Sequence, residues 1–270
     1  MKFDFVKASL DLSNSDTNHV VPKIETVQQA RDAHLRLVTA LRESGEAGRT
    51  LARRINACRS ERCRSAACPV CLRHFRLWWG SEIAAYMDQG FNSWFTVNIV
   101  PSDQSFPVGE LSRFRWDHVK DRLRQQIARS DLHGSIIVGG FDYSLQAFRG
   151  ERSPKWRPHM YFLTQTGGIA RIEAALRRYY PRDEDTPRPV MVTQQKTSRS
   201  DLIATATYSF KSFFYERRPR ADQRGNADTR HQVLAPARQA ELALLLDKQG
   251  FSGRMLRRGS DPSFRLLTTR

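Results

Sequence analysis

The stretch that decides the fold is GSIIVGGFDYSL at residues 134–145, followed by KWRPHMYFLTQ at 155–165. Both runs are rich in β-branched and aromatic residues, which pack well on a pleated sheet. The intervening segment QAFRGERSP, at 146–154, is polar and contains glycine and proline, as loops between strands commonly do. The two runs are therefore predicted to pair as an antiparallel hairpin.

Further elements are predicted on both sides of this hairpin. FNSWFTVNIV at 91–100 and PVMVTQQ at 189–195 are typical of strands. Apolar residues at three- and four-residue steps predict helices at about 109–130 and 169–180. The order strand, helix, strand, strand, helix, strand indicates an α+β fold of the ferredoxin-like kind (βαββαβ). Such a fold has an antiparallel sheet with both helices on one face, and its other face remains free to carry a site.

The segments outside this core are more polar. Amphipathic helices are predicted at about 25–45 and 199–217, and a further apolar helix at about 236–249. The segment 218–235 is predicted to be a basic loop. The predicted organisation is a flexible N-terminus (1–24), a helix with a cysteine-rich zinc-binding segment (25–90), a catalytic core (91–217), and a basic loop with a C-terminal helical extension (218–270).

The charge of the chain indicates a polyanionic partner. It holds 44 Lys and Arg against 28 Asp and Glu, a net charge of +16. Nucleic acid, an anionic membrane and an acidic protein are the three candidates, and nucleic acid is favoured. No stretch approaches the roughly 20 apolar residues of a membrane span, and the N-terminus lacks a signal-peptide apolar region. We therefore expect a cytoplasmic location and no membrane partner.

The four cysteines of the chain lie close together in sequence. Cys58, Cys63, Cys68 and Cys71 are spaced C-x4-C-x4-C-P-V-C, which is typical of tetrahedral structural zinc. The alternatives are two disulfides or four unrelated buried thiols. A cytoplasmic location disfavours disulfides, and the polar residues between the cysteines disfavour burial. Structural Zn²⁺ is therefore predicted, since four protein ligands leave no open position for substrate.

Strand alternation predicts a polar face within 155–165. It places His159 and Tyr161 on one face, and Met160 and Phe162 on the face that packs against helices. Asp142, on the paired strand, can reach the face of His159, although its register is not encoded in the sequence. A lone histidine on a strand is more often structural than a ligand, so this pattern alone is weak.

The segment TATYSFKSFFYERR contains a candidate nucleophile. On a helix, Tyr208, Lys211 and Tyr215 lie together, opposite an apolar side. The apolar side comprises Leu202, Ile203, Ala206, Phe210, Phe213 and Phe214. A phenol with a pKa near 10 is a poor nucleophile at neutral pH, and an adjacent ammonium favours the phenolate. An exposed aromatic beside a solvated lysine is the alternative interpretation.

Taken in order, these motifs resemble those of the rolling-circle replication (Rep) proteins of the HUH endonuclease superfamily. The resemblance covers roughly residues 58–217 and includes the cysteine cluster, a PH-x-aromatic strand and Y-S-F-K. It implies a ferredoxin-like sheet whose His-hydrophobe-His motif binds catalytic Mg²⁺ or Mn²⁺. It also implies that a tyrosine nicks one DNA strand, leaving a 5′-phosphotyrosyl link and a 3′-hydroxyl primer.

The resemblance assigns roles residue by residue. His159 matches the first motif histidine, Tyr208 the nucleophile and Lys211 its lysine, while Asp142 falls where the family often has an acidic ligand. Tyr161 stands where the second histidine belongs, and a neutral phenol binds Mg²⁺ weakly. This departure leaves open whether the catalytic metal site is retained.

Two functions follow from this departure. In the first, His159, Asp142 and a further ligand such as Glu151 hold the cation, and the protein is a metal-dependent nicking and strand-transferring endonuclease. In the second, it is a catalytically degenerate DNA-binding regulator. Tyr215 is a DNA-stacking or surface residue or, in the bolder interpretation, a second acceptor. The expected partners are a single-stranded or hairpin DNA origin and, for a plasmid initiator, the host helicase and polymerase.

Basic and aromatic residues offer DNA contacts outside the motifs. The Arg-rich segments 52–64 and 217–230 can neutralise phosphates, and Trp78, Trp79 or Trp156 can stack on bases. Core packing is the expected role of at least one of the adjacent Trp78 and Trp79. A zinc-containing RNA-binding protein is a third hypothesis. It lacks support, since neither an RRM-type aromatic motif nor a KH-type loop occurs.

Overall fold

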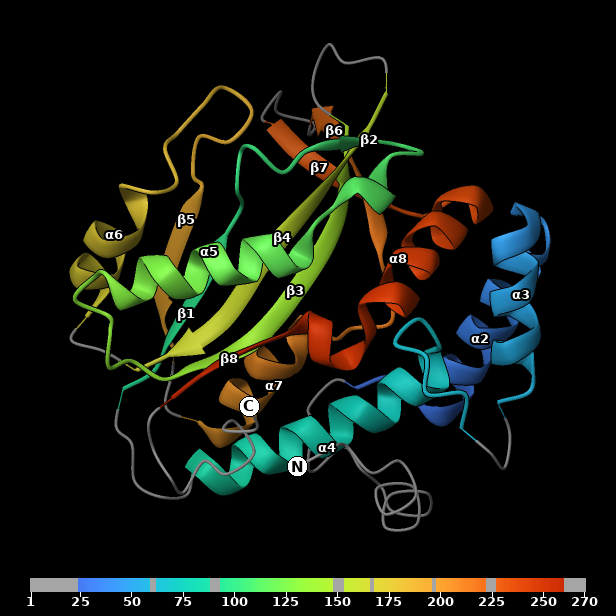
Figure 1. Ribbon diagram of the computed structural model, residues 1–270, viewed down its shortest axis with the longest axis horizontal. Helices are drawn as coiled ribbons and strands as arrows, with labels where there is room; N and C mark the ends of the chain where they lie inside the picture. The colour runs from blue at the N-terminus through green and yellow to red at the C-terminus, as the bar shows by residue number, and fades with distance from the viewer. Residues whose placement is uncertain are drawn as a thin grey trace.

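A curled, mixed β-sheet with helices around it makes the protein α+β (Figure 1). The computed structural model describes residues 24–58, 62–87, 93–147, 153–165, 168–195, 198–221 and 227–259. The α-helices of these residues are α2 (Val27–Arg42), α3 (Gly45–Asn56), α4 (Pro69–Met87), α5 (Trp116–Ala128), α6 (Ile169–Arg177), α7 (Arg199–Tyr208) and α8 (Pro236–Arg254), with a 3-10 helix η2 (Leu111–Arg113). The strands are β1 (Phe95–Ile99), β2 (Phe106–Pro107), β3 (Ile137–Gln146), β4 (Lys155–Thr164), β5 (Val190–Gln194), β6 (Tyr215–Ala221), β7 (Ala227–Val233) and β8 (Met255–Arg258).

The predicted hairpin is the centre of the sheet. Strands β3 and β4 pair antiparallel along their whole length, with Asp142 directly opposite His159 and Gly140 opposite Tyr161. The main strand order is β5-β1-β4-β3-β6-β7, while β2 pairs with β4 and β8 with β3. Neighbours are antiparallel except for β3 and β6, which pair in parallel over two residues. The sheet is therefore mixed, whereas the sequence predicts a purely antiparallel one.

The two faces of the central hairpin are covered by different helices. Phe141, Met160 and Phe162 point to one face and are buried there, with Phe141 packed edge-on against Phe114 just before α5. Figure 1 shows α5 and α6 across this face. The opposite face carries Asp142 and His159 and is contacted by α7. The expectation that this face stays free is therefore wrong, and the site lies between the sheet and α7.

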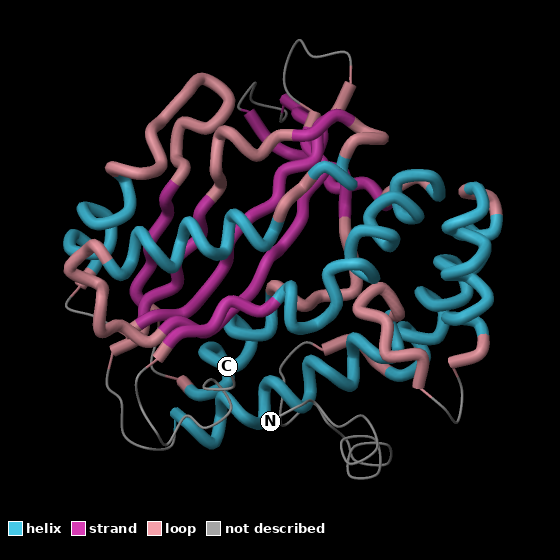
Figure 2. Tube along the Cα trace, in the orientation of Figure 1, coloured by secondary structure: helices cyan, strands magenta, loops and turns pink. Residues whose placement is uncertain are grey.

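Helices α2, α3 and α8 gather beside the sheet, and α4 runs along its lower edge in the view of Figures 1 and 2. Contacts of α2 with α3, α4 and α8 join them into one helical layer. The apolar side of α4 enters the common core through Phe75, which stacks on Phe251 of α8. Helices α3 and α4 were not predicted. None of the described helices is long and apolar enough to cross a membrane.

The structure corrects the sequence most clearly after residue 199. The predicted helix at 199–217 ends at Tyr208, so Lys211 lies in the following turn and Tyr215 begins β6. The predicted basic loop at 218–235 contains most of the β6–β7 hairpin. This hairpin joins the free edge of β3, where Ala147 N donates to Arg217 O at 2.9 Å. The edge of β3 supplies backbone partners that local sequence periodicity does not reveal.

Candidate functional site

The side chains predicted for the site converge from β3, β4 and the end of α7. Asp142 and His159 are cross-strand partners, so their side chains share one face of the hairpin. Lys211 Nζ donates to Asp142 Oδ2 at 2.5 Å, although the two residues are 69 positions apart. The Asp142 side chain is only 5% exposed and that of Lys211 19%. The structure therefore brings together an aspartate, a histidine and a lysine in a largely buried cluster.

Tyr208 covers this cluster from the last residue of α7. Its side chain is 40% exposed, unlike the core aromatics. The Lys211 ammonium lies 4.2 Å from the centre of the Tyr208 ring. The ring centres of Tyr161 and Tyr208 are 5.1 Å apart. A cation at this distance from a phenol stabilises negative charge that develops on it. The phenol is thus accessible and next to a positive charge that Asp142 holds in place.

The turn after α7, which carries Lys211, is held in place by buried contacts. Phe210 is fully buried, and the buried guanidinium of Arg254 donates to Ser209 O at 2.6 Å. A Cβ on Gly140 would lie 2.8 Å from the Phe210 ring, so this close approach requires glycine in β3. The end of α7 therefore seats directly on the sheet, which places Tyr208 over Tyr161.

His159 is held as a neutral imidazole. Its Nε2 and Ser144 Oγ lie 3.0 Å apart in a hydrogen bond. Burial, and to a smaller extent the positive charges of Arg217 and Lys211, lowers the pKa of His159 to about 4, against the opposing effect of Asp142. The ring is therefore uncharged at neutral pH. Burial and the neighbouring Tyr208 raise the pKa of Tyr161 to about 12, so Tyr161 is also neutral.

The described residues do not fit a catalytic divalent cation. His159 and Asp142 lie together, and Asp142 Oδ1 is buried without a hydrogen-bond partner. However, Oδ2 already binds the Lys211 ammonium, and the part of the chain that the structure describes brings no third carboxylate, imidazole or thiolate to these two. Tyr161 remains a neutral phenol, and Glu151 lies outside the described residues. The ammonium of Lys211 supplies the positive charge at this position.

A cavity opens in front of Tyr208. Its volume is about 840 Å³, and its lining holds Tyr208, Lys211 and Tyr215 together with residues from α2, α4 and β7. The charged side chains of the lining are Arg36, Arg76, Lys211, Arg217, Glu25 and Asp32. Cations thus outnumber carboxylates by four to two. The cavity has the size and charge of a site for a small anionic group.

Glu25, just before α2, is a site residue that the sequence did not reveal. Its buried carboxylate forms an ion pair with Arg76 and accepts a hydrogen bond from Ser212 Oγ at 2.8 Å. Arg73 Nε donates to the backbone oxygen of Glu25 at 2.8 Å. Glu25 therefore ties the helical layer to the turn that carries Lys211. In the sequence, Glu25 is marked only by its position beside Thr26, whose side chain caps the N-terminus of α2.

The tryptophans proposed for base stacking lie elsewhere. Trp79 and Trp156 are buried in the core, and Trp78 packs against it. The prediction that Trp79 or Trp156 stacks on DNA is therefore wrong. Tyr215 is 41% exposed and stacks on His231 with ring centres 5.8 Å apart. The exposed aromatic pair of this region is on the β6–β7 hairpin.

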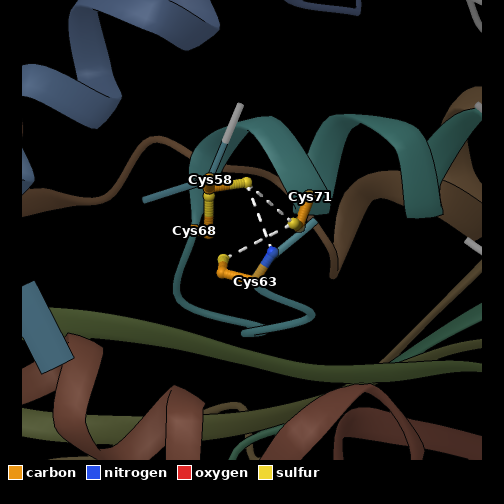
Figure 3. A group of neighbouring side chains, drawn as sticks. All are labelled: Cys58, Cys63, Cys68 and Cys71. Carbon is orange, nitrogen blue, oxygen red and sulfur yellow. Dashed lines mark hydrogen bonds between the residues drawn. The ribbon is translucent and has the colours of Figure 1, made fainter. Parts of the chain in front are cut away.

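The four cysteines form the second site (Figure 3). The Sγ atoms of Cys58, Cys63, Cys68 and Cys71 all lie within 4.8 Å of one another, and Cys71 Sγ is 3.5 Å from Cys58 Sγ and 3.6 Å from Cys63 Sγ. Tetrahedral zinc with Zn–S bonds of about 2.3 Å requires sulfur separations of about 3.8 Å. The cluster therefore fits a structural zinc site.

The surroundings of the cysteines favour a cation. The neighbouring sulfurs, that of Cys58 above all, and burial raise the pKa of the Cys68 and Cys71 thiols. Four thiolates therefore cannot coexist here unless a cation offsets their charge. Cys71 lies in the first turn of α4, whose N-terminal dipole also favours thiolate. His34 of α2 lies behind the cluster, with Nδ1 3.7 Å from Cys68 Sγ.

The cysteine segment is attached to the helical layer. Ser65 Oγ donates to Asp247 of α8 at 2.7 Å, and Arg54 of α3 forms an ion pair with the same carboxylate. The layer that zinc would hold together also carries the Arg36 and Arg76 side chains of the cavity.

No family model, curated protein or solved structure matches this chain.

Proposed function

We propose that the protein nicks DNA by transesterification, with Tyr208 as the nucleophile. The observation that carries this proposal is the placement of Tyr208 and Lys211 in the lining of a cationic cavity, with Asp142 bound to Lys211 and paired with His159 behind them. A buried ion pair contributes little net stability. Its position beneath an exposed phenol therefore favours a chemical role.

In the proposed step the Tyr208 oxygen attacks a backbone phosphorus in line. A tyrosyl O–P bond forms as the P–O3′ bond breaks, the phenolic proton passes to solvent, and the departing 3′-oxygen takes up a proton. The products are a 5′-phosphotyrosyl strand and a 3′-hydroxyl, with no water consumed and no change of oxidation state. Attack by a 3′-hydroxyl reverses the step and reseals a strand. A free 3′-hydroxyl primes DNA synthesis, so initiation of replication is the expected context.

Lys211 is proposed to supply the electrostatic stabilisation. Its ammonium lies between the Asp142 carboxylate and the Tyr208 ring. There it can offset the negative charge that builds on the phosphate oxygens as the Tyr208 oxygen attacks. Asp142 fixes the ammonium, so little reorganisation is needed during the reaction. The reaction as proposed needs no catalytic Mg²⁺ or Mn²⁺, which departs from what the family resemblance implies.

The strand order supports the relationship to HUH endonucleases. Strands β5, β1, β4 and β3 are neighbours in that order, all antiparallel. Helix α5 connects β1 and β2 to β3, and α6 connects β4 to β5. We propose that these four strands and two helices form a ferredoxin-like core, to which β6, β7 and β8 would be additions.

The test is a cleavage assay on a pool of randomised single-stranded oligonucleotides labelled at the 3′ end. The wild-type protein should form an SDS-resistant adduct that carries the label. Tyr208→Phe should form none, whereas Tyr179→Phe, a matched change in the turn after α6, should behave as wild type. An adduct that persists in Tyr208→Phe would contradict the assignment of the nucleophile.

A second candidate function is a non-catalytic DNA-binding regulator. The poor fit of the described residues to a divalent cation favours it, since metal is central to the family's chemistry. The same assay separates the two functions. No adduct under any condition, combined with salt-sensitive DNA binding, would support the regulator.

A further inference from the structure

One face of the β6–β7 hairpin carries aromatic and basic side chains into the cavity. Strand alternation puts Tyr215 and Arg217 on the same face, and Arg217 pairs directly with His231 of β7. Tyr215 and His231 are diagonal neighbours, with ring planes inclined by only 25°. All three residues line the cavity that holds Tyr208 and Lys211.

The neighbouring residue on β6 has a different role. Glu216 points away from this face, is buried, and forms ion pairs with Arg218 and Arg238. The contact with Arg238 attaches the hairpin to α8. The hairpin that carries the stacked pair is therefore anchored to α8, whereas Tyr215 and His231 are themselves exposed. Exposed aromatic rings on a rigid element favour contact with a ligand over core packing.

We propose that Tyr215 and His231 form a base-stacking subsite that binds an unpaired nucleotide of the DNA strand held at Tyr208. The inference rests on the proposed function, because it takes DNA to be the substrate. Aromatic faces accept any base, whereas basic side chains between them hold the backbone. In this cavity Arg217, Arg36 and Lys211 provide the positive charge.

The arginines beside the stack are available for phosphates. Neither Arg36 nor Arg217 forms an ion pair with a carboxylate among the described residues, whereas Arg76 is engaged by Glu25. Arg36 is exposed on α2 and lines the same cavity as the hairpin residues. A strand bound in this cavity would meet cations of α2 and β6 and the aromatic pair of the β6–β7 hairpin.

The geometry favours single strands over duplex. A base can stack on Tyr215 only when its own face is free, and bases inside a duplex are stacked on one another. The cavity of about 840 Å³ lies within the size range of small-ligand sites. The substrate class is therefore single-stranded DNA, or the unpaired loop of a hairpin.

Binding is tested with Tyr208→Phe protein, so that cleavage cannot contribute. The probe is a fluorescein-labelled 12-nucleotide oligothymidine, followed by fluorescence anisotropy, with a 12-base-pair duplex and an oligouridine as comparison ligands. Adding Tyr215→Ala should weaken oligothymidine binding about tenfold, because one stacked base contributes about 1–3 kcal/mol. His231→Ala should weaken it in the same direction, and duplex binding should change less than twofold in both.

Tyr215→Phe is the matched control, because it keeps the ring and removes only the hydroxyl. It should bind within about twofold of the parent, as should Tyr179→Ala in the turn after α6, and circular dichroism should show that all variants are folded. Unchanged affinity in Tyr215→Ala and His231→Ala, an equal loss for duplex, or tighter binding of oligouridine would overturn the subsite. Failure of the proposed function is seen separately, as the absence of an adduct with wild-type protein.

Discussion

At the scale of single residues, Lys211 connects the buried and exposed parts of the site. It neutralises Asp142 and touches the Tyr208 ring. We expect Lys211→Met to slow adduct formation about a hundredfold, as for the loss of one charge-stabilising group, with DNA affinity changed far less. Lys211→Arg should restore part of the rate. The rate is measured under single-turnover conditions.

The control for this change addresses folding. Lys211→Met leaves the Asp142 carboxylate buried and unpaired, which destabilises the protein. The double variant Lys211→Met with Asp142→Asn removes that charge, so its thermal stability should return toward wild type while its rate stays low. Full activity in the double variant would show that Lys211 acts only structurally.

His159 makes stability depend on pH. The pKa of its side chain is about 4 in the folded protein, against 6.5 as its ordinary value, so the unfolded chain binds more protons between these limits. The free energy of unfolding should therefore fall as pH decreases from about 6.5 to 4, and His159 should account for up to about 3 kcal/mol of the loss. Urea denaturation of wild type and His159→Gln at several pH values measures the difference.

The matched control is His133→Gln, which removes an exposed histidine from the loop before β3. It should keep the wild-type pH dependence, whereas His159→Gln should be flatter across this window. If the free energy of unfolding changes with pH equally in wild type and His159→Gln, His159 takes up its proton in the folded protein as it does in the unfolded chain.

Single residues show what sequence can and cannot reveal about the site. Alternation in 155–165 predicts that His159 and Tyr161 share a face, and the paired strands bring Asp142 opposite His159. Glu25 and His231 were not predicted to lie at the site. Glu25 contacts Arg76 and Ser212, which lie 51 and 187 residues away in the chain, and His231 reaches the site through the β6–β7 pairing of a segment that is predicted to be a loop. Such contacts are set by tertiary packing, which no local period encodes.

At the scale of elements, the sequence predicts those with a clear local period. The hairpin β3–β4, helix α2 and helix α6 were predicted with small errors at their ends. The region 199–233 was not, since Phe210, Phe213 and Phe214 fit a helical period although the helix ends at Tyr208. Backbone partners on β3 and the Arg254 contact to Ser209 decide this segment. Tertiary structure here overrides local propensity.

The cysteine segment gives a prediction at the same scale. The purified protein should hold about one zinc per chain, measured by elemental analysis. Removing zinc, or introducing Cys63→Ser, should lower the melting temperature by ten degrees or more, because a structural zinc contributes about 10 kcal/mol to local folding. DNA affinity should fall with it, since α2 and α4 carry part of the cavity.

Remetallation separates a metal effect from damage. Wild-type protein stripped of zinc should regain its melting temperature and its DNA binding when zinc is returned, whereas Cys63→Ser should regain less of both. A stripped protein that melts like the zinc-loaded one would exclude a structural role for the cluster.

At the scale of the whole molecule, the net charge of +16 predicts strongly salt-dependent DNA binding. For single strands, log Kd should change with log salt by about 0.7 for each phosphate neutralised. Arg217→Gln should reduce that slope by about 0.7, while Arg113→Gln, an exposed arginine already paired with Glu110, should leave it unchanged. Equal salt dependence of log Kd in wild type, Arg217→Gln and Arg113→Gln would mean that DNA binds elsewhere on the surface.

The central claim is that the Tyr208 oxygen becomes covalently bonded to DNA. The most direct measurement is to incubate the zinc-loaded protein with single-stranded oligonucleotides in buffer without added Mg²⁺ or Mn²⁺, digest it, and map the modified peptide by mass spectrometry. The expected result is a nucleotide attached to Tyr208 through a phosphodiester. A nucleotide attached to another residue such as Tyr215, or an adduct that appears only when Mg²⁺ or Mn²⁺ is added, would contradict it.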